Sequence, residues 1–314
     1  MSDESKVISI KGKKHVVRSI PVGPKATVVV TGGMLKTGRV HDEYWLDSSD
    51  IPQHDSILEM LKKVPSRPDI YTFAQKLPDI ARRYSYRYEW DNYAVAHFES
   101  YSDWYGNHID RNTQRNIKKS AKEKVKVDIV SYSDDYVKGI CSIYNELEVR
   151  QGKKFWHYGK DFETVKKENA TYLDRSVYLG AYFEQELIGF IKMVIVDGVA
   201  ILMQILSKAA YYEKRPTNAL LSKAVDYCDQ NEIRYLVYGE YVYGNKEESS
   251  LIDFKRKNGF EKVDIPRYYV PLTLKGRLAL RMNLHKGIKA WIPASAIPIL
   301  LNIRSKWLKY SSGD

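Results

Sequence analysis

The chain has 314 residues, of which 44% are hydrophobic and 28% charged, a composition that suits a globular protein with a sizeable core. Two cysteines are too few for a disulfide framework, so we expect a reducing, cytoplasmic compartment. The N-terminus lacks the apolar stretch of a signal peptide, and we expect no membrane-spanning helix because no apolar run reaches roughly 18–20 residues.

The net charge of +11 is concentrated in two segments. Residues 111–126 contain seven basic side chains and one acidic one, and residues 273–310 contain eight basic side chains and no acidic one. Such fields predict an anionic partner: a small-molecule or lipid-linked acceptor, tRNA or other nucleic acid, or an anionic membrane. The tail 273–314 also carries Trp and Leu, so it either lies peripherally on the inner membrane face or packs over the protein.

The first part of the chain predicts a small α/β region over residues 1–101. Short strands are expected near 6–10, 14–20 and 26–30, and a helix over 55–64. The stretches 84–90 and 92–98 favour two strands of a hairpin that turns at Asp91–Asn92.

A single basic helix is predicted over residues 102–124, with Ser102 or Asp103 as its N-cap. Arg111 and Arg115 are four residues apart on this helix and therefore share one face. That face either is simply solvated or binds the phosphate of a substrate.

From residue 125 to 272 the predicted elements follow a regular order. A strand and two helices (134–150 and 162–173) precede three strands at 177–183, 187–196 and 199–207, joined by links short enough for hairpins. A helix (216–230), a strand (234–239), a helix (249–258) and two closing strands follow. We expect these residues to form one mixed, largely antiparallel sheet with helices packed against it.

This order of elements resembles the GNAT acyltransferase fold, and three stretches are similar to its FemAB-like branch, the aminoacyltransferases of peptidoglycan and exopolysaccharide. The stretches are residues 93–127, with the basic segment "RNTQRNIKKS"; "RPTNALLSKAVDYC" (215–228); and "YGEYVYGNKEESSLIDFKRKNGF" (238–260). The resemblance implies an α/β fold in which a GNAT-like catalytic domain (125–272) follows a small, truncated region that is a degenerate half-domain.

The resemblance also implies the activity, which is transfer of an acyl or aminoacyl group onto an amine of a cell-envelope or polysaccharide precursor. The donor is acyl-CoA or aminoacyl-tRNA. Two alternatives stay open: an ordinary acyl-CoA-dependent N-acetyltransferase, and a non-catalytic RNA-binding module, which basic faces and many tyrosines would also suit.

The predicted catalytic residues lie after the strand 234–239. Amide formation needs a neutral amine, a stabilised oxyanion and a proton for the leaving group. Glu240, Tyr241 and Tyr243 are candidates for the base and the acid. Lys255 matches the lysine of the family's Phe-Lys motif, so the resemblance suggests that it stabilises the oxyanion.

The turn before the helix 216–230 is the predicted donor site. A strand, a turn and a helix N-terminus commonly hold a phosphate, yet this turn lacks the glycines that let a backbone approach pyrophosphate. Lys214, Arg215 and Asn218 are therefore the predicted phosphate-binding residues, together with Arg111 and Arg115. Otherwise Pro216 merely starts a helix at its favoured first position.

An aromatic loop is predicted to bind the acceptor. Phe155, Trp156, His157 and Tyr158 combine flat apolar surface with polar edges, which suits a sugar or peptide, although His157 is also explained as an ordinary loop histidine. The histidines and cysteines show no metal-ligand spacing, so no metal cofactor is expected.

Overall fold

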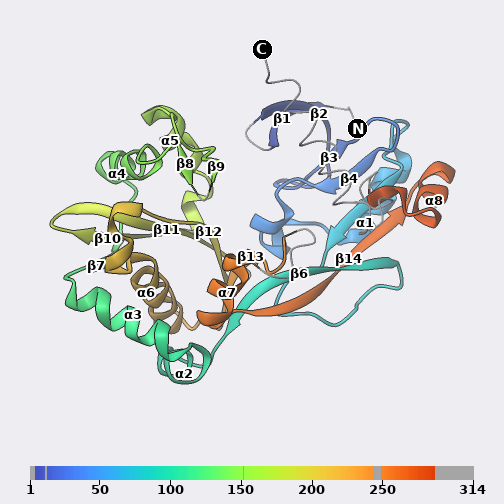
Figure 1. Ribbon diagram of the computed structural model, residues 1–314. Coiled ribbons are helices and arrows are strands. Elements are labelled where there is room, and N and C mark those ends of the chain that lie inside the picture. The colour runs from blue at the N-terminus through green and yellow to red at the C-terminus, as the bar shows by residue number, and fades with distance from the viewer. Residues whose placement is uncertain (1–3, 11–12, 151, 244–248, 287–314) are drawn as a thin grey trace, which may run out of the picture. The chain divides into compact units, whose positions relative to one another are not determined.

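The computed structural model describes residues 4–10, 13–150, 152–243 and 249–286, and the chain divides into two compact units (Figure 1). Unit 1 contains residues 1–41, 51–73 and 268–314, and unit 2 contains residues 42–50 and 74–267. The chain therefore passes between the units four times. These bounds do not coincide with the predicted boundaries at 101, 124 and 272.

Unit 1 is an α/β unit with an antiparallel meander. Its first four strands pair in chain order, and the fifth is parallel to the fourth because a helix connects them. The helix α1 buries Ile57, Leu58 and Leu61, which are spaced on one face. The elements are β1 (Glu4–Ile10), β2 (Lys13–Pro21), β3 (Thr27–Thr31), β4 (Thr37–Val40), α1 (His54–Lys63), β5 (Ile70–Ala74) and α8 (Leu274–Arg281).

Unit 2 contains a mixed sheet with the strand order β14-β6-β13-β12-β11-β10-β7. The pairs β7–β10, β10–β11, β11–β12 and β6–β13 are antiparallel, whereas β12 and β13 are parallel. The strands are β6 (Arg87–His97), β7 (Lys126–Val130), β10 (Ser176–Phe183), β11 (Glu186–Val196), β12 (Val199–Ser207), β13 (Tyr235–Glu240) and β14 (Glu261–Pro271), the last of which continues into unit 1.

Two tight hairpins join β10, β11 and β12, as predicted. The connecting residues Glu184–Gln185 and Asp197–Gly198 all have positive φ, between 48° and 74°. Such a pair of left-handed residues matches the right-handed twist of the flanking strands.

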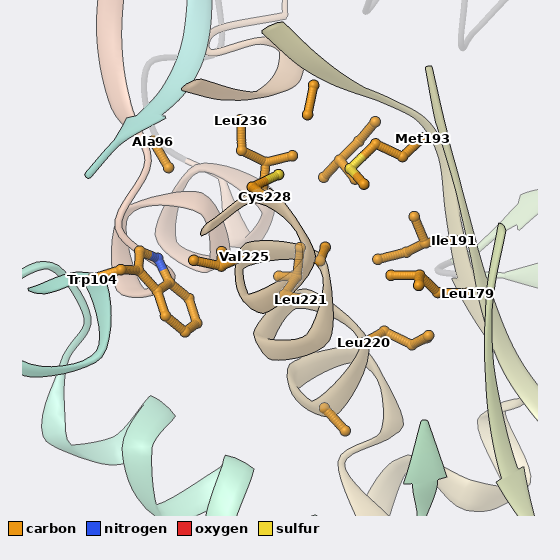
Figure 2. Packing of buried hydrophobic residues seen from close by; sticks show 14 of the residues in the cluster. Ala96, Trp104, Leu179, Ile191, Met193, Leu220, Leu221, Val225, Cys228 and Leu236 are labelled. Carbon is orange, nitrogen blue, oxygen red and sulfur yellow. The ribbon is translucent and has the colours of Figure 1, made fainter. Parts of the chain in front are cut away.

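Helices cover both faces of this sheet. Neighbouring residues of β10 point to opposite faces: Leu179 belongs to the cluster of buried residues that contains α6, whereas Tyr178 belongs to the cluster that contains α4. Figure 2 shows Leu220, Leu221 and other side chains of α6 against the sheet. The helices are α2 (Tyr101–Asp103), α3 (Arg111–Lys122), α4 (Asp134–Tyr144), α5 (Phe162–Asn169), α6 (Pro216–Gln230) and α7 (Ser250–Lys257), so α4 and α5 end several residues earlier than predicted.

The single helix predicted over 102–124 is wrong, because two helices with a break between them occupy this segment. A π-helical turn (Trp104–His108) follows α2, and Ile109 is extended (φ −102°, ψ 151°). The Asp110 carboxylate then caps α3 by accepting the Thr113 amide at 2.6 Å. The buried Trp104 indole donates to the Asn258 carbonyl at 3.1 Å, and this tertiary contact fixes the break.

The hairpin predicted at Asp91–Asn92 is also wrong, since β6 runs straight through both residues. Their polar side chains make tertiary contacts instead of a turn. Asn92 Oδ1 accepts the Val242 amide at 2.6 Å, and the Asp91 carboxylate accepts from Arg267 Nε at 2.6 Å.

Candidate active site

The candidate site begins where β12 and β13 separate. The two strands pair over only two residue pairs, ending with Ile201 opposite Val237. Beyond this point β12 continues with β11 as far as Ser207, and β13 continues with β6 as far as Glu240. Both strands have a register shift just after the separation, and such bulges bend a strand away from its neighbour. The carboxyl ends of parallel strands are a common place for ligands.

Lys255 is completely buried beside the end of β13. Ser249 caps α7 and helps to set its direction, since its hydroxyl accepts the Ile252 amide at 3.2 Å. The Lys255 ammonium donates a hydrogen bond to the Glu240 carbonyl and lies 4.7 Å from the ring centre of Tyr243. It lies 4.8 Å from the ring centre of Tyr238. Burial lowers the pKa of Lys255 to about 8, and the Glu240 charge partly opposes this shift.

Glu240 and Tyr243 therefore lie close to Lys255, and the catalytic roles predicted for them stay predictions. Burial and the nearby Asp91 raise the pKa of Glu240, while Lys255 lowers it. Burial and the Glu240 charge raise the pKa of Tyr243, whose side chain is about half exposed. Tyr241 is placed differently, because it packs against the main core and donates its amide to the Asn92 carbonyl at 3.4 Å.

Gly239 allows this arrangement. Its φ of +59° is a left-handed conformation that other residues rarely adopt. A Cβ added to Gly239 would lie 2.7 Å from the Tyr243 hydroxyl oxygen. Any side chain here would therefore displace Tyr243 as well as strain the backbone.

Arg267, which the sequence did not indicate as a functional residue, connects β6 to the segment 42–50. Arg267 Nη1 donates to Glu43 at 2.8 Å, and its Nε donates to Asp91 at 2.6 Å. Burial and Asp91 raise the pKa of Tyr93, which also contacts Arg267, to about 12. The sequence gives no local signal for this group, because its members come from three distant segments.

The turn before α6 is held by acidic side chains of the same chain. Lys214 Nζ lies 3.1 Å from the Glu123 carboxylate and 4.0 Å above the Phe183 ring. Arg215 has a left-handed φ of 58°, and its guanidinium lies 3.7 Å from Glu213. The basic groups predicted to hold a phosphate therefore have carboxylate partners, and their role stays a prediction.

Two backbone amides at the start of this turn also have a partner within the chain. The Glu146 carboxylate accepts the amides of Ala209 and Ala210 at 2.7 and 2.9 Å. Asn218 is buried and donates to the Asn258 side chain at 3.3 Å. The turn thus binds a carboxylate of its own chain.

The aromatic loop divides between core and surface. His157 is buried, with its ring centre 4.0 Å from that of Tyr144, and burial together with Lys160 lowers its pKa to about 3. His157 is thus a neutral core residue. Its neighbours Phe155, partly buried, and Trp156 and Tyr158, both exposed, are the ones that retain surface for an acceptor.

Arg111 and Arg115 lie exposed on α3. Among the described residues their side chains face solvent. This position fits both predicted alternatives, a solvated face and a phosphate-binding face.

No group of three or more His, Cys, Asp or Glu side chains able to hold a metal ion occurs among residues 4–10, 13–150, 152–243 and 249–286. Within those same ranges, none of the helices has the length and apolar character needed to cross a membrane.

Comparison with known proteins gives matches at the level of structure. The sequence matches no protein-family model and no curated protein. The C-terminal domain of a putative lysylphosphatidylglycerol synthetase from Agrobacterium fabrum superposes with a TM-score of 0.55 at 12% identity, over 84% of this chain and 87% of that one. FemX matches with a TM-score of 0.53 at 7% identity, over 88% and 90%.

A third structure, L-PGS from Bacillus licheniformis, matches with a TM-score of 0.52 at 12% identity, over 85% of this chain and 87% of that one. These likenesses confirm the predicted fold class, an α/β, GNAT-like acyltransferase fold with a mixed, largely antiparallel sheet. Since unit 2 comprises only residues 42–50 and 74–267, matches of this extent include segments of unit 1.

Proposed function

We propose that the chain is an acyltransferase that moves an acyl or aminoacyl group onto an amine of a cell-envelope or polysaccharide precursor. The observation that carries the proposal is the placement of Lys255. On this acyltransferase fold, a completely buried ammonium lies at the end of β13, where β12 and β13 separate. A preorganised donor in a site of low dielectric constant stabilises a developing oxyanion strongly.

The proposed reaction uses three neighbouring side chains. The neutral amine of the acceptor attacks the carbonyl carbon of the donor, so a C–N bond forms and the carbonyl oxygen becomes an oxyanion facing Lys255. Glu240 takes the proton that the amine loses, a role that its raised pKa favours. The bond between carbon and the leaving oxygen or sulfur then breaks, and Tyr243 gives the leaving atom a proton. Glu240 passes the proton that it took from the amine to Tyr243, so both side chains regain their initial states.

The satisfied turn before α6 favours an aminoacyl-tRNA over acyl-CoA as donor. The first two amides of the turn already bind the Glu146 carboxylate, and this carboxylate together with Glu213 would repel a pyrophosphate that approached the turn. The phosphates of a tRNA have another partner available in the exposed Arg111 and Arg115 of α3.

The acceptor that we propose is anionic and lipid-linked. One structural neighbour is a putative lysylphosphatidylglycerol synthetase, a name that refers to the anionic lipid phosphatidylglycerol; this supports an anionic lipid as the class of acceptor, although the acceptor group of that lipid is a hydroxyl. The exposed Trp156 and Tyr158 would contact it. Most of the basic tail 273–314, for which we keep the proposal of peripheral contact with an anionic membrane, lies outside the described residues.

The test is a comparison of donors on the full chain. Transfer of a radiolabelled amino acid from charged tRNA, and of an acetyl group from acetyl-CoA, is measured onto a lysine-containing muropeptide linked to a lipid through pyrophosphate, with phosphatidylethanolamine as the lipid amine that has no net charge. We expect transfer from the charged tRNA, lost in Lys255→Met. Transfer from acetyl-CoA alone would establish the acetyltransferase alternative, and RNA binding without any transfer would establish the binding module.

A further inference from the structure

Unit 2 contains a cavity that the catalytic proposal does not use, and we name it the Tyr44 cavity. The space that the centre of a water-sized molecule can occupy in it is about 40 Å³, more than the roughly 10–15 Å³ that one water needs. Polar side chains at its edge include Glu43, Tyr44 and Tyr93. Its walls are mostly apolar: Leu77, Val196, Val199, Ile201, Val237 and Ile265.

Two buried polar atoms of this cavity have no hydrogen-bond partner among the described residues. Glu43 gives one carboxylate oxygen to Arg267 at 2.8 Å, but its Oε2 is buried without a partner. The hydroxyl of Tyr44 is likewise buried and unpaired, although its ring is stacked on Tyr93 with centroids 5.5 Å apart. Buried polar atoms are almost always satisfied, so such exceptions indicate a missing ligand or water.

This polar end of the cavity is close to the candidate active site. Tyr44 interacts electrostatically with Glu240 and with Tyr243, and these charges together with burial raise its pKa. Val237, which lines the cavity, precedes Glu240 by three residues on β13. Tyr93, which also lines the cavity, is the cross-strand partner of Glu240, so the polar end of the cavity adjoins the end of β13 that carries Glu240.

The charge balance at this end favours a cationic ligand. Three carboxylates lie here, on Glu43, Asp91 and Glu240, against two cations, Arg267 and Lys255. Lys76 also lines the cavity; it lies 3.6 Å from Asp197 and interacts electrostatically with Glu43 as well, so with this pair included four carboxylates lie against three cations. An acceptor oxygen without a donor and a surplus negative charge together suit an ammonium group.

We propose that the Tyr44 cavity binds a primary ammonium group with a short apolar body, the ammonium contacting Glu43 Oε2 and the Tyr44 hydroxyl while the body lies between the apolar walls. This inference rests on the proposed acyltransferase function. The same chemistry occurs in the α-amino group of an aminoacyl donor and in the amine of an acceptor. Neutral acyl groups, such as acetyl, lack the charge that the cavity requires.

The probe pair is L-leucinamide and 4-methylpentanamide, which share a carbon skeleton and differ in the ammonium group. Binding to the full chain is followed by protein-observed NMR. We expect the ammonium compound to bind at least about tenfold more tightly, because a hydrogen bond to a charged group contributes about 1.5–3 kcal/mol. Tyr44→Phe should weaken leucinamide about fivefold or more, and Ala74→Leu, which fills the cavity, should weaken both probes.

Thr72→Val is the matched control, since the Thr72 hydroxyl is also buried without a partner but belongs to unit 1. Equal affinity for the two probes, or unchanged leucinamide affinity in both Tyr44→Phe and Ala74→Leu, would overturn the inference. In the transfer assay, competition by leucinamide against the donor assigns the ammonium to the aminoacyl group, and competition against the acceptor assigns it to the amine. If leucinamide competes with neither substrate, the inference is contradicted even though transfer is intact. If leucinamide binds but the chain transfers nothing, only the proposed function is contradicted.

Discussion

Lys192 in β11 and Lys255 in α7 are both completely buried in unit 2, yet their ammonium groups have different surroundings. Lys192 donates to the Asn169 carbonyl at 2.9 Å and to the carbonyl and hydroxyl of Thr171 at 2.6 and 2.8 Å, so all three of its N–H groups are used. Lys255 has one oxygen partner in the described chain, the Glu240 carbonyl, and otherwise faces two aromatic rings. Burial lowers both pKa values to about 8, so the two lysines differ in the number of oxygen partners that the described residues give them and not in pKa.

The largest effect that we expect is on catalysis by Lys255→Met. Loss of one preorganised oxyanion donor typically lowers kcat about 10²–10³-fold, or roughly 3–4 kcal/mol, and raises KM much less. Steady-state kinetics with the transfer assay measure this effect. Lys192→Met is the matched control, and its kcat should stay within about threefold of the wild type, well below the loss of an oxyanion donor. Similar losses in both variants would remove the distinction between the two lysines.

Glu240→Gln tests whether the Glu240 side chain acts as the base of a reaction beside Lys255. The change removes the base but keeps the backbone carbonyl that accepts from Lys255. We expect kcat to fall about 100-fold, at the lower end of the usual contribution of a general base. A pH–rate profile provides the second readout, since the acidic limb should disappear. A variant that keeps both its rate and its acidic limb would exclude Glu240 as the base.

Lys192→Met should affect folding more than catalysis. It removes one of two donors from the Asn169 carbonyl, which keeps the Tyr178 hydroxyl, and one of two from the Thr171 carbonyl, which keeps the Ser176 hydroxyl at 3.3 Å. Loss of the hydrogen bonds to this charged group should cost about 1–3 kcal/mol in the free energy of unfolding. Urea denaturation measures the loss. Unchanged stability would show that the three hydrogen bonds only compensate for burial of the charge.

The pH dependence of the free energy of unfolding should reflect the lowered pKa values of both lysines. Their pKa values are about 8 in the folded chain and 10.5 ordinarily, so the unfolded chain binds more protons between these values. Stability should therefore rise with pH from about 8 towards 10.5. Denaturation between pH 7.5 and about 9.5, below the ordinary tyrosine pKa, measures this slope. Each Lys→Met variant should lose part of it, and a slope that both variants retain would contradict the shifts.

The smallest effect concerns charges that are not buried at all. Arg111→Glu with Arg115→Glu reverses two exposed charges on α3 and should raise the KM for a tRNA donor by a few-fold to tenfold, with thermal stability nearly unchanged. The effect should decline at high salt. Lys62→Glu with Lys63→Glu on α1 is the control for net charge. Equal KM values in both double variants would identify the α3 face as merely solvated.

Periodicity predicted the sheet of unit 2 well and the segments with tertiary contacts poorly. The strands β10, β11 and β12 and the helix α6 occur at their predicted positions because apolar runs and tight turns are local signals. The two errors, a helix break that was not predicted and a predicted turn that does not form, both depend on distant partners. Trp104 reaches Asn258, and Asp91 reaches Arg267, so no local pattern distinguishes them from helix and turn residues.

The candidate site was predictable only where a motif marked it. Lys255 was predicted from the family resemblance and Glu240 from its position at the end of a predicted strand; the structure brings them together, and their catalytic roles stay predictions. Burial was not predictable, since a lysine and a histidine are usually solvated. His157 is instead a neutral core residue, and Glu43, Tyr44 and Arg267 gave no signal because folding alone brings them together.

The positive φ of Gly239 has a consequence for relatives of this chain. Because a Cβ there would meet the Tyr243 hydroxyl, the two positions are not free to vary independently during evolution. Sequences that keep tyrosine four residues after this glycine should keep the glycine as well. Those that replace the glycine should have lost the tyrosine, and with it the aromatic face over the buried lysine. This paired substitution is a signature by which sequences that retain the site can be separated from those that retain only the fold.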